Sequence, residues 1–141
     1  MRTTEAFDKV GLAGRVISIT GGTGGIGRAT TLLCAARGAS VVIADLDEQK
    51  GSELVDLIRQ AGGNAAFKRT DVTSEGDVEA LIDFADSTFG GLHAAFNNAG
   101  LETGLTPFSD FPLEQWQRGL AWLELLLDPD SVALEFRKCL P

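Results

Sequence analysis

The stretch that decides the fold runs from Val16 to Gly27 and reads V-I-S-I-T-G-G-T-G-G-I-G. Its first part is an apolar, β-branched run, which is typical of a buried strand. Glycines follow, and an apolar helical spacing begins at Ile26, so the stretch predicts a strand, a loop and a helix. Glycine lacks the Cβ that would block close approach to the backbone, and the N–H groups at a helix start carry partial positive charge. The stretch therefore predicts a loop that binds a diphosphate.

The overall composition narrows the class of protein. The chain has 141 residues, with Lys+Arg 12 and Asp+Glu 20, which gives a formal net charge of −8. The length fits one domain, and a hydrophobic fraction of 44% indicates a folded globule. A chain this acidic is a poor candidate for binding nucleic acid or an anionic membrane. Without a secretory signal or a long apolar span, we expect a cytoplasmic protein with no membrane partner.

The two cysteines, Cys34 and Cys139, lie in apolar helical patterns. Neither has a partner at metal-ligand spacing, so no metal site is expected. We interpret both as buried, reduced thiols in a reducing compartment.

The segment after the glycine loop predicts a second strand between two helices. The first helix ends at Gly38, a strand follows over Val41–Ala44, and Asp47 is a good N-cap for the next helix, which ends at Gly62-Gly63. Apolar residues at helical spacing predict the buried faces. These are Ile26, Ala29, Leu32, Leu33 and Ala36 in the first helix, and Leu54, Leu57 and Ile58 in the second.

The next part of the chain repeats this alternation. A more polar strand over about 65–69 suits a sheet edge, and Ser74 with Asp77 predicts the start of a helix through about Phe89. Its predicted face holds Val78, Leu81, Ile82 and Ala85. A fourth apolar strand covers Leu92–Phe96. The pattern predicts an α/β, Rossmann-like doubly wound parallel sheet of about four strands in the order 3-2-1-4, with the ligand at their carboxyl ends.

The C-terminal part predicts helices only. After Pro112 we expect one helix from Leu113 to about Leu127, a break at Asp128-Pro129, and a shorter helix from Asp130 to about Cys139.

Asp45 ends the second predicted strand and indicates which nucleotide binds. A carboxylate there can accept hydrogen bonds from both hydroxyls of an adenosine ribose, and it would repel a 2′-phosphate. No Lys or Arg occurs between Gly21 and Gly27, and Leu46 follows Asp45. The expected cofactor is therefore NAD, preferred over NADP; a helix-capping carboxylate is the structural alternative.

Three motifs together resemble the short-chain dehydrogenase/reductase family. They are Thr20–Gly27 for T-G-x-x-x-G-x-G, Asp71-Val72 for the adenine-pocket D-V, and Asn97–Gly100 for N-N-A-G. The resemblance covers about residues 12–118 of a single NAD(P)-binding Rossmann domain, 1–141, and leaves 119–141 as a divergent helical tail. A methyltransferase on the same sheet is disfavoured by the N-N-A-G motif.

The resemblance also implies roles for individual residues. Asp71 would bond the adenine amino group, Val72 would contact the adenine, and Asn98-Ala99-Gly100 would line the cofactor and stabilise the sheet. The full set of predicted cofactor-binding residues is Gly21, Thr23, Gly24, Gly25, Ile26, Gly27, Asp45, Leu46, Asp71, Val72, Asn98, Ala99 and Gly100.

The same resemblance implies hydride transfer between nicotinamide and an alcohol or carbonyl, with a tyrosine, a lysine, a serine and an asparagine as catalytic residues. The chain contains no tyrosine, and Leu123 stands where the family pattern places the asparagine, so no catalytic residue is assigned. We interpret 122–129 as an insertion or aberrant junction in a truncated enzyme that is inactive alone and takes a substrate only with a C-terminal half. The alternative is a non-catalytic dinucleotide-binding or interaction module that pairs with a full-length relative.

Two features of the fourth strand complete the sequence-based expectations. His93 is the only histidine, but it lies at the start of that strand, away from the expected ligand, so we predict a structural role. The strand is apolar and would be an open edge, which predicts a marginal or aggregating monomer unless another chain, in a homo- or hetero-oligomer, covers it.

Overall fold

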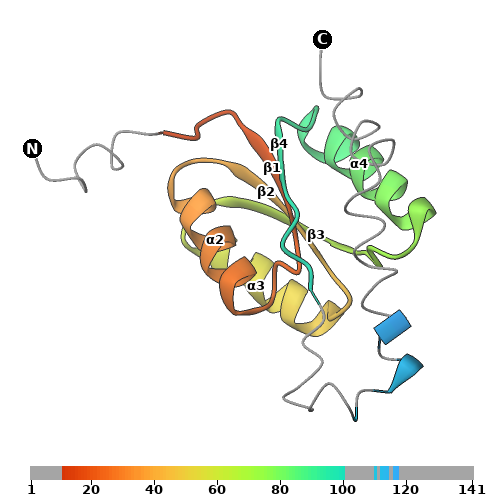
Figure 1. Ribbon diagram of the computed structural model, residues 1–141. Coiled ribbons are helices and arrows are strands. Elements are labelled where there is room, and N and C mark those ends of the chain that lie inside the picture. Colours follow the sequence, from red (N-terminus) through yellow and green to blue (C-terminus); the bar gives the residue numbers. More distant parts are fainter. Residues whose placement is uncertain (1–10, 101–109, 111, 115, 118–141) are drawn as a thin grey trace, which may run out of the picture.

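The computed structural model describes residues 11–100, 110, 112–114 and 116–117. Strands and helices alternate along this part of the chain, as the sequence predicts (Figure 1). The elements are β1 (Val16–Thr20), α2 (Gly25–Ala36), β2 (Ser40–Asp45), α3 (Glu48–Gln60), β3 (Asn64–Arg69), α4 (Glu75–Phe89) and β4 (Ala94–Phe96).

The strands form one parallel sheet in the order β3-β2-β1-β4, which confirms the predicted topology. The chain moves from β1 outward to β3 and then returns to the other side of β1 for β4. The strand order therefore reverses between β1 and β4, and in open α/β sheets the ligand-binding crevice lies at the carboxyl ends of the strands at such a point.

Helices cover both faces of the sheet. Figure 1 shows α2 and α3 on one face and α4 on the other. Alternate residues of the strands point to opposite faces of the sheet and form two cores. Ile19 and Ile43 pack beneath α2 and α3, whereas Val42 and Ala44 pack beneath α4. Burial on both faces explains why β1 and β2 are nearly continuous apolar runs.

The predicted buried face of α2 is wrong except for Leu32, which is half-buried and packs against the core. The buried residues are Gly27, Thr31 and Ala35, whereas Ile26 is 72% exposed and Leu33 is 51% exposed. The helix packs closely on the sheet and the glycine loop, and only small side chains fit that contact. A Cβ on Gly27, for example, would meet the backbone of the loop. The volume available, rather than the apolar pattern, therefore selects which face is buried.

The predicted N-caps are confirmed in both later helices. The Asp47 side chain accepts from the Lys50 N–H at the start of α3, and the Ser74 hydroxyl accepts from the Asp77 N–H at the start of α4. In α3 the predicted face is correct for Leu54 and Ile58, but Leu57 is 44% exposed.

The prediction that Cys34 is buried is wrong in degree. Cys34 is a free thiol that packs beside the core under α2 and α3, but it is only half-buried. Burial raises the pKa of this thiol, and the charge of Arg37 opposes that rise. Cys139 lies outside the described residues.

β4 begins later than predicted because the Val16 N–H donates to the His93 side chain and not to the backbone of this strand, and Leu92 is buried against α4. His93 links this strand to β1 through two contacts with Val16. Its Nδ1 accepts the Val16 N–H at 3.0 Å, and its own N–H donates to the Val16 carbonyl at 2.9 Å. The sequence prediction of a structural histidine is therefore confirmed.

Most of the predicted C-terminal helices lie outside the described residues. Leu113, Glu114, Trp116 and Gln117 are helical, in agreement with the expected helix start after Pro112. The proposed junction at 122–129 and the helix from Asp130 are not among the described residues. Where the structure is described, no helix is both long and apolar enough to cross a membrane.

Two leucines of α3 test this packing with the same substitution. Leu54 is 3% exposed, so Leu54→Ala should lower the free energy of unfolding by about 2–5 kcal/mol through lost burial and a cavity. Leu57→Ala, on the exposed side, should cost about 1 kcal/mol or less. Urea unfolding followed by circular dichroism measures both, and equal losses would contradict the assigned face.

Candidate functional site

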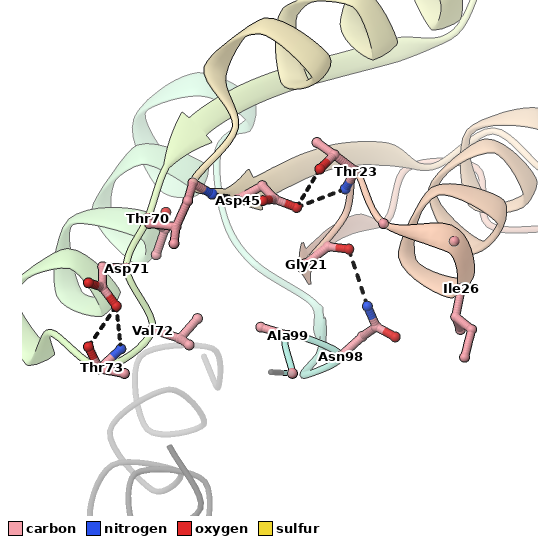
Figure 2. Close-up of a pocket in the computed structure, with 14 residues that line it drawn as sticks. Gly21, Thr23, Ile26, Asp45, Thr70, Asp71, Val72, Thr73, Asn98 and Ala99 are labelled. Atoms are coloured by element: carbon pink, nitrogen blue, oxygen red, sulfur yellow. Dashed lines mark hydrogen bonds between the residues drawn. The ribbon is translucent and has the colours of Figure 1, made fainter. Parts of the chain in front are cut away.

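A cavity of about 610 Å³ opens at the carboxyl end of the sheet, between the loops that follow β1, β2, β3 and β4. Figure 2 shows the residues that surround it. They are Gly21, Thr23, Gly24, Gly25, Ile26, Asp45, Leu46, Thr70, Asp71, Val72, Thr73, Asn98, Ala99 and Gly100. Of the predicted cofactor-binding residues, only Gly27 is not part of this lining.

Gly27 lies behind the cavity lining, where it packs against the glycine loop and Asn98. It is buried, and a Cβ at this position would lie 2.8 Å from the Asn98 side-chain nitrogen and against the Gly21 backbone. Gly21 is equally constrained, because it has a positive φ of 63° and its Cβ would lie 2.9 Å from Ala99 Cα. These two positions require glycine so that the loop, α2 and the turn after β4 can meet.

Asn98 and Thr20 hold that meeting point together. The Asn98 Nδ2 donates to the carbonyls of Thr20 and Gly21, each at 3.2 Å. In return the Thr20 hydroxyl accepts the backbone N–H groups of Asn98 at 3.0 Å and Ala99 at 3.1 Å. The hydrogen bonds tie the end of β1 to the turn after β4, so the glycine loop is fixed from the neighbouring strand.

The start of α2 differs from the starts of the other helices in the described residues. Its N-cap, Gly24, makes no side-chain hydrogen bond, and its first turn has no acidic residue. By contrast, α3 and α4 are capped by side chains and carry acidic residues in their first turns. Gly24, Gly25 and Ile26 line the cavity at this helix start, and a Cβ on Gly25 would meet nothing within 4 Å. This helix start suits an anion.

Asp45 lies at the end of β2, beside the glycine loop. Its Oδ2 accepts the Thr23 N–H at 3.0 Å and the Thr23 hydroxyl at 2.7 Å (Figure 2). Its Oδ1 accepts the Leu46 N–H at 2.8 Å and the Asp47 N–H at 3.4 Å. The carboxylate is therefore firmly oriented at the cavity wall.

Asp71 is a second carboxylate at the wall, after β3. Its Oδ1 accepts the Thr73 hydroxyl at 2.7 Å and the Thr73 N–H at 2.9 Å, while its own N–H donates to Asp77 at 2.8 Å. The hydroxyl and then the amide of Thr73 lower the pKa of Asp71 below its usual value. Sequence reasoning missed Thr70 and Thr73 as lining residues, although a hydroxyl two positions after an Asp is a signal for such a turn.

Apolar side chains complete the lining. Ile26 and Leu46 are exposed at 72% and 55%, and Val72 is half-buried. The lining thus combines glycine backbone, apolar side chains and two carboxylates, with no Lys or Arg among its residues. Such a surface can accept hydroxyl donors, pack against a flat ring and bind an anion only at the start of α2.

The family is shown by comparison with known proteins. A family model described as short chain dehydrogenase matches residues 15–122, and the chain belongs to this family. The resemblance seen in the sequence motifs is confirmed.

Individual relatives agree with this assignment. Cyclohexanol dehydrogenase of Acinetobacter sp. (strain SE19) is 40% identical over 104 residues, which are 74% of this chain and 41% of that protein. 7alpha-hydroxysteroid dehydrogenase of Escherichia coli (strain K12) is 40% identical over 111 residues, 79% of this chain and 43% of that one. The chain thus spans about two fifths of the length of these curated relatives.

Solved structures show the same relationship. A hydroxysteroid dehydrogenase from Escherichia coli superposes with a TM-score of 0.75 at 36% identity, over 92% of this chain and 52% of that chain. A short-chain type dehydrogenase/reductase from Mycobacterium marinum superposes with a TM-score of 0.78 at 30% identity. The match covers 94% of this chain and 51% of that chain.

The hydrogen bond between Thr73 and Asp71 predicts a pH effect. Thr73→Val removes the hydroxyl donor, so the pKa of Asp71 should rise toward its usual value. A depressed folded-state pKa stabilises above the unfolded pKa, and that contribution is lost as pH falls through the folded pKa. The variant should therefore be less stable near neutral pH and converge with the wild type in acid.

A carbon NMR titration of the Asp71 carboxyl measures the shift directly. Thr30→Val is the control, because the Thr30 hydroxyl donates to the Ile26 carbonyl and not to a carboxylate. If Thr73→Val leaves the Asp71 titration unchanged, the assigned cause is wrong.

Proposed function

We propose that this chain binds NAD(H) in the cavity at the carboxyl end of the sheet and prefers it to NADP(H). The observation that carries the proposal is the pairing, across one cavity, of an uncapped helix start with a fixed carboxylate. The family's nicotinamide dinucleotides need both groups, one for the diphosphate and one for the adenosine ribose.

The diphosphate would lie against Gly24, Gly25 and Ile26. The absence of a Cβ contact at Gly25 leaves room for phosphate oxygens close to the backbone. The first N–H groups of α2 and the positive end of the helix dipole would donate to those oxygens.

The preference for NAD rests on charge. Asp45 and Asp71 both line the adenosine side of the cavity, and the lining includes no Lys or Arg that could bind a 2′-phosphate. A 2′-hydroxyl can donate to the Asp45 carboxylate, whereas a 2′-phosphate would meet two negative charges.

The reaction we propose for the whole enzyme is oxidation of an alcohol or reduction of a carbonyl. The relatives named above are dehydrogenases, which favours an oxidoreductase over a non-catalytic module. When bound, the nicotinamide supplies the hydride acceptor or donor. The residues that line the cavity would hold and orient that cofactor. The 141 residues contain no tyrosine to act as the acid.

The proposal extends to the cellular compartment of the protein and to the segment that would pair with β4. The half-buried, free Cys34 thiol suits a reducing, cytoplasmic compartment. Within the described residues β4 pairs with β1 alone, so its other edge is where a second protein segment, from an oligomer or a C-terminal half, would add.

Two matched substitutions test the cofactor preference. The wild type should bind NADH about tenfold or more tightly than NADPH, because the carboxylate favours a hydroxyl donor and repels a phosphate. Asp45→Asn should weaken NADH binding about tenfold and reduce the difference between the cofactors. Calorimetric titration measures each dissociation constant.

Asp56→Asn is the control for this experiment, because it removes the same charge from an exposed position in the middle of α3, outside the cavity lining. It should leave both affinities unchanged. Wild-type binding of NADPH as tight as NADH would refute the charge argument.

A turnover assay tests whether this chain binds the cofactor but needs a C-terminal half for catalysis. The chain alone should form no NADH from NAD with cyclohexanol or a 7α-hydroxysteroid, the substrate classes named for two relatives. Activity should appear when a C-terminal half of a relative, carrying the tyrosine, is supplied. Turnover by the chain alone would show that another residue acts as the acid.

A further inference from the structure

The Asp45 carboxylate is already fully hydrogen-bonded before any ligand is considered. Its two oxygens accept from the N–H groups of Thr23, Leu46 and Asp47 and from the Thr23 hydroxyl. A carboxylate offers about four acceptor sites. A ribose hydroxyl that donates to Asp45 must therefore replace one of these donors or share its acceptor.

The four donors are not equally replaceable. Three are backbone amides held by the end of β2, the start of α3 and the glycine loop. The fourth is the Thr23 hydroxyl, which sits on a side chain that can rotate about χ1. It also makes the shortest of the contacts, 2.7 Å, and Thr23 lines the cavity. The hydroxyl is thus both on the ligand side and free to leave.

We infer that the Thr23 hydroxyl occupies the acceptor position on Asp45 Oδ2 that an adenosine ribose hydroxyl takes on binding. Thr23 is then an internal competitor that sets affinity for the ribose. This inference rests on the proposed binding of NAD(H), and it adds a residue that tunes it.

The opposite role, in which Thr23 holds Asp45 ready for the ribose, is less consistent with the contacts. The amides already orient both carboxylate oxygens, so the hydroxyl adds little to the orientation. Removing it exposes one acceptor to water, and a tethered hydroxyl is harder to displace than a mobile water. The two roles predict opposite changes in affinity.

Thr23→Val in the 141-residue chain distinguishes them, because valine keeps the branched shape and the backbone N–H but has no hydroxyl. The probes are ADP and 2′,3′-dideoxy-ADP, which differ only in the ribose hydroxyls. Thr23→Val should bind ADP about threefold to tenfold more tightly than the wild type, the range that one exchanged hydrogen bond spans. Binding of dideoxy-ADP should be unchanged.

Thr23→Ser keeps the hydroxyl and should match the wild type with both probes. Circular dichroism checks that each variant is folded, and Thr23→Ala provides the same loss of hydroxyl if Thr23→Val does not fold. Weaker or unchanged ADP binding by the variants without the hydroxyl overturns the inference, as does an equal change for both probes.

The wild type separates this inference from the proposed function. If it binds ADP no better than dideoxy-ADP, the ribose contact at Asp45 is wrong, and the inference fails with it. If it prefers ADP and the variants lacking the hydroxyl show no gain, the ribose contact stands and only the competitor role of Thr23 fails.

Discussion

The close approach of three backbone segments at Gly21 is the constraint on which the rest of this structure depends. The loop after β1, the start of α2 and the turn after β4 meet there, at distances that leave no room for a Cβ. The Asn98 side chain and the Thr20 hydroxyl satisfy the polar groups at this junction. A hydrogen-bonded junction without side-chain bulk is what allows a helix N-terminus to face the crevice between β1 and β4.

The start of α2 explains how a chain with a net negative charge could bind an anion. Any favourable potential for phosphate would come from backbone N–H groups, because the lining includes no Lys or Arg, and it would be confined to the first turn of α2. The carboxylates of Asp45 and Asp71 also line the cavity, and each is held by a threonine, Thr23 and Thr73 respectively. The cavity wall therefore combines a helix start that favours negative charge with two carboxylates that disfavour it, and the proposed preference for NAD(H) over NADP(H) rests on this combination.

Much of the fold could be predicted from the sequence because its signals are local. Buried parallel strands read as apolar runs, Asp47 and Ser74 mark helix starts, and the glycine loop fixes the first crossover. The buried face of α2 could not be predicted, because apolar residues occur on more than one side and only the space above the sheet selects Gly27, Thr31 and Ala35. The contact of Thr23 with Asp45 joins residues 22 positions apart, and its geometry depends on how the loop and β2 end meet.

The buried face of α2 consists of the small residues Gly27, Thr31 and Ala35, and this restricts which substitutions the helix can accept. The helix has 12 residues, so it is about 18 Å long, and Thr31 lies near its middle, fully buried over the sheet. A larger side chain there would overpack the contact and push α2 away from the sheet, and the helix start at Gly25 would move with it. Substitutions at the rim of the cavity, such as those at Asp45 and Leu46, would change its lining without moving the helix, whereas the buried position of Thr31 accepts only small side chains.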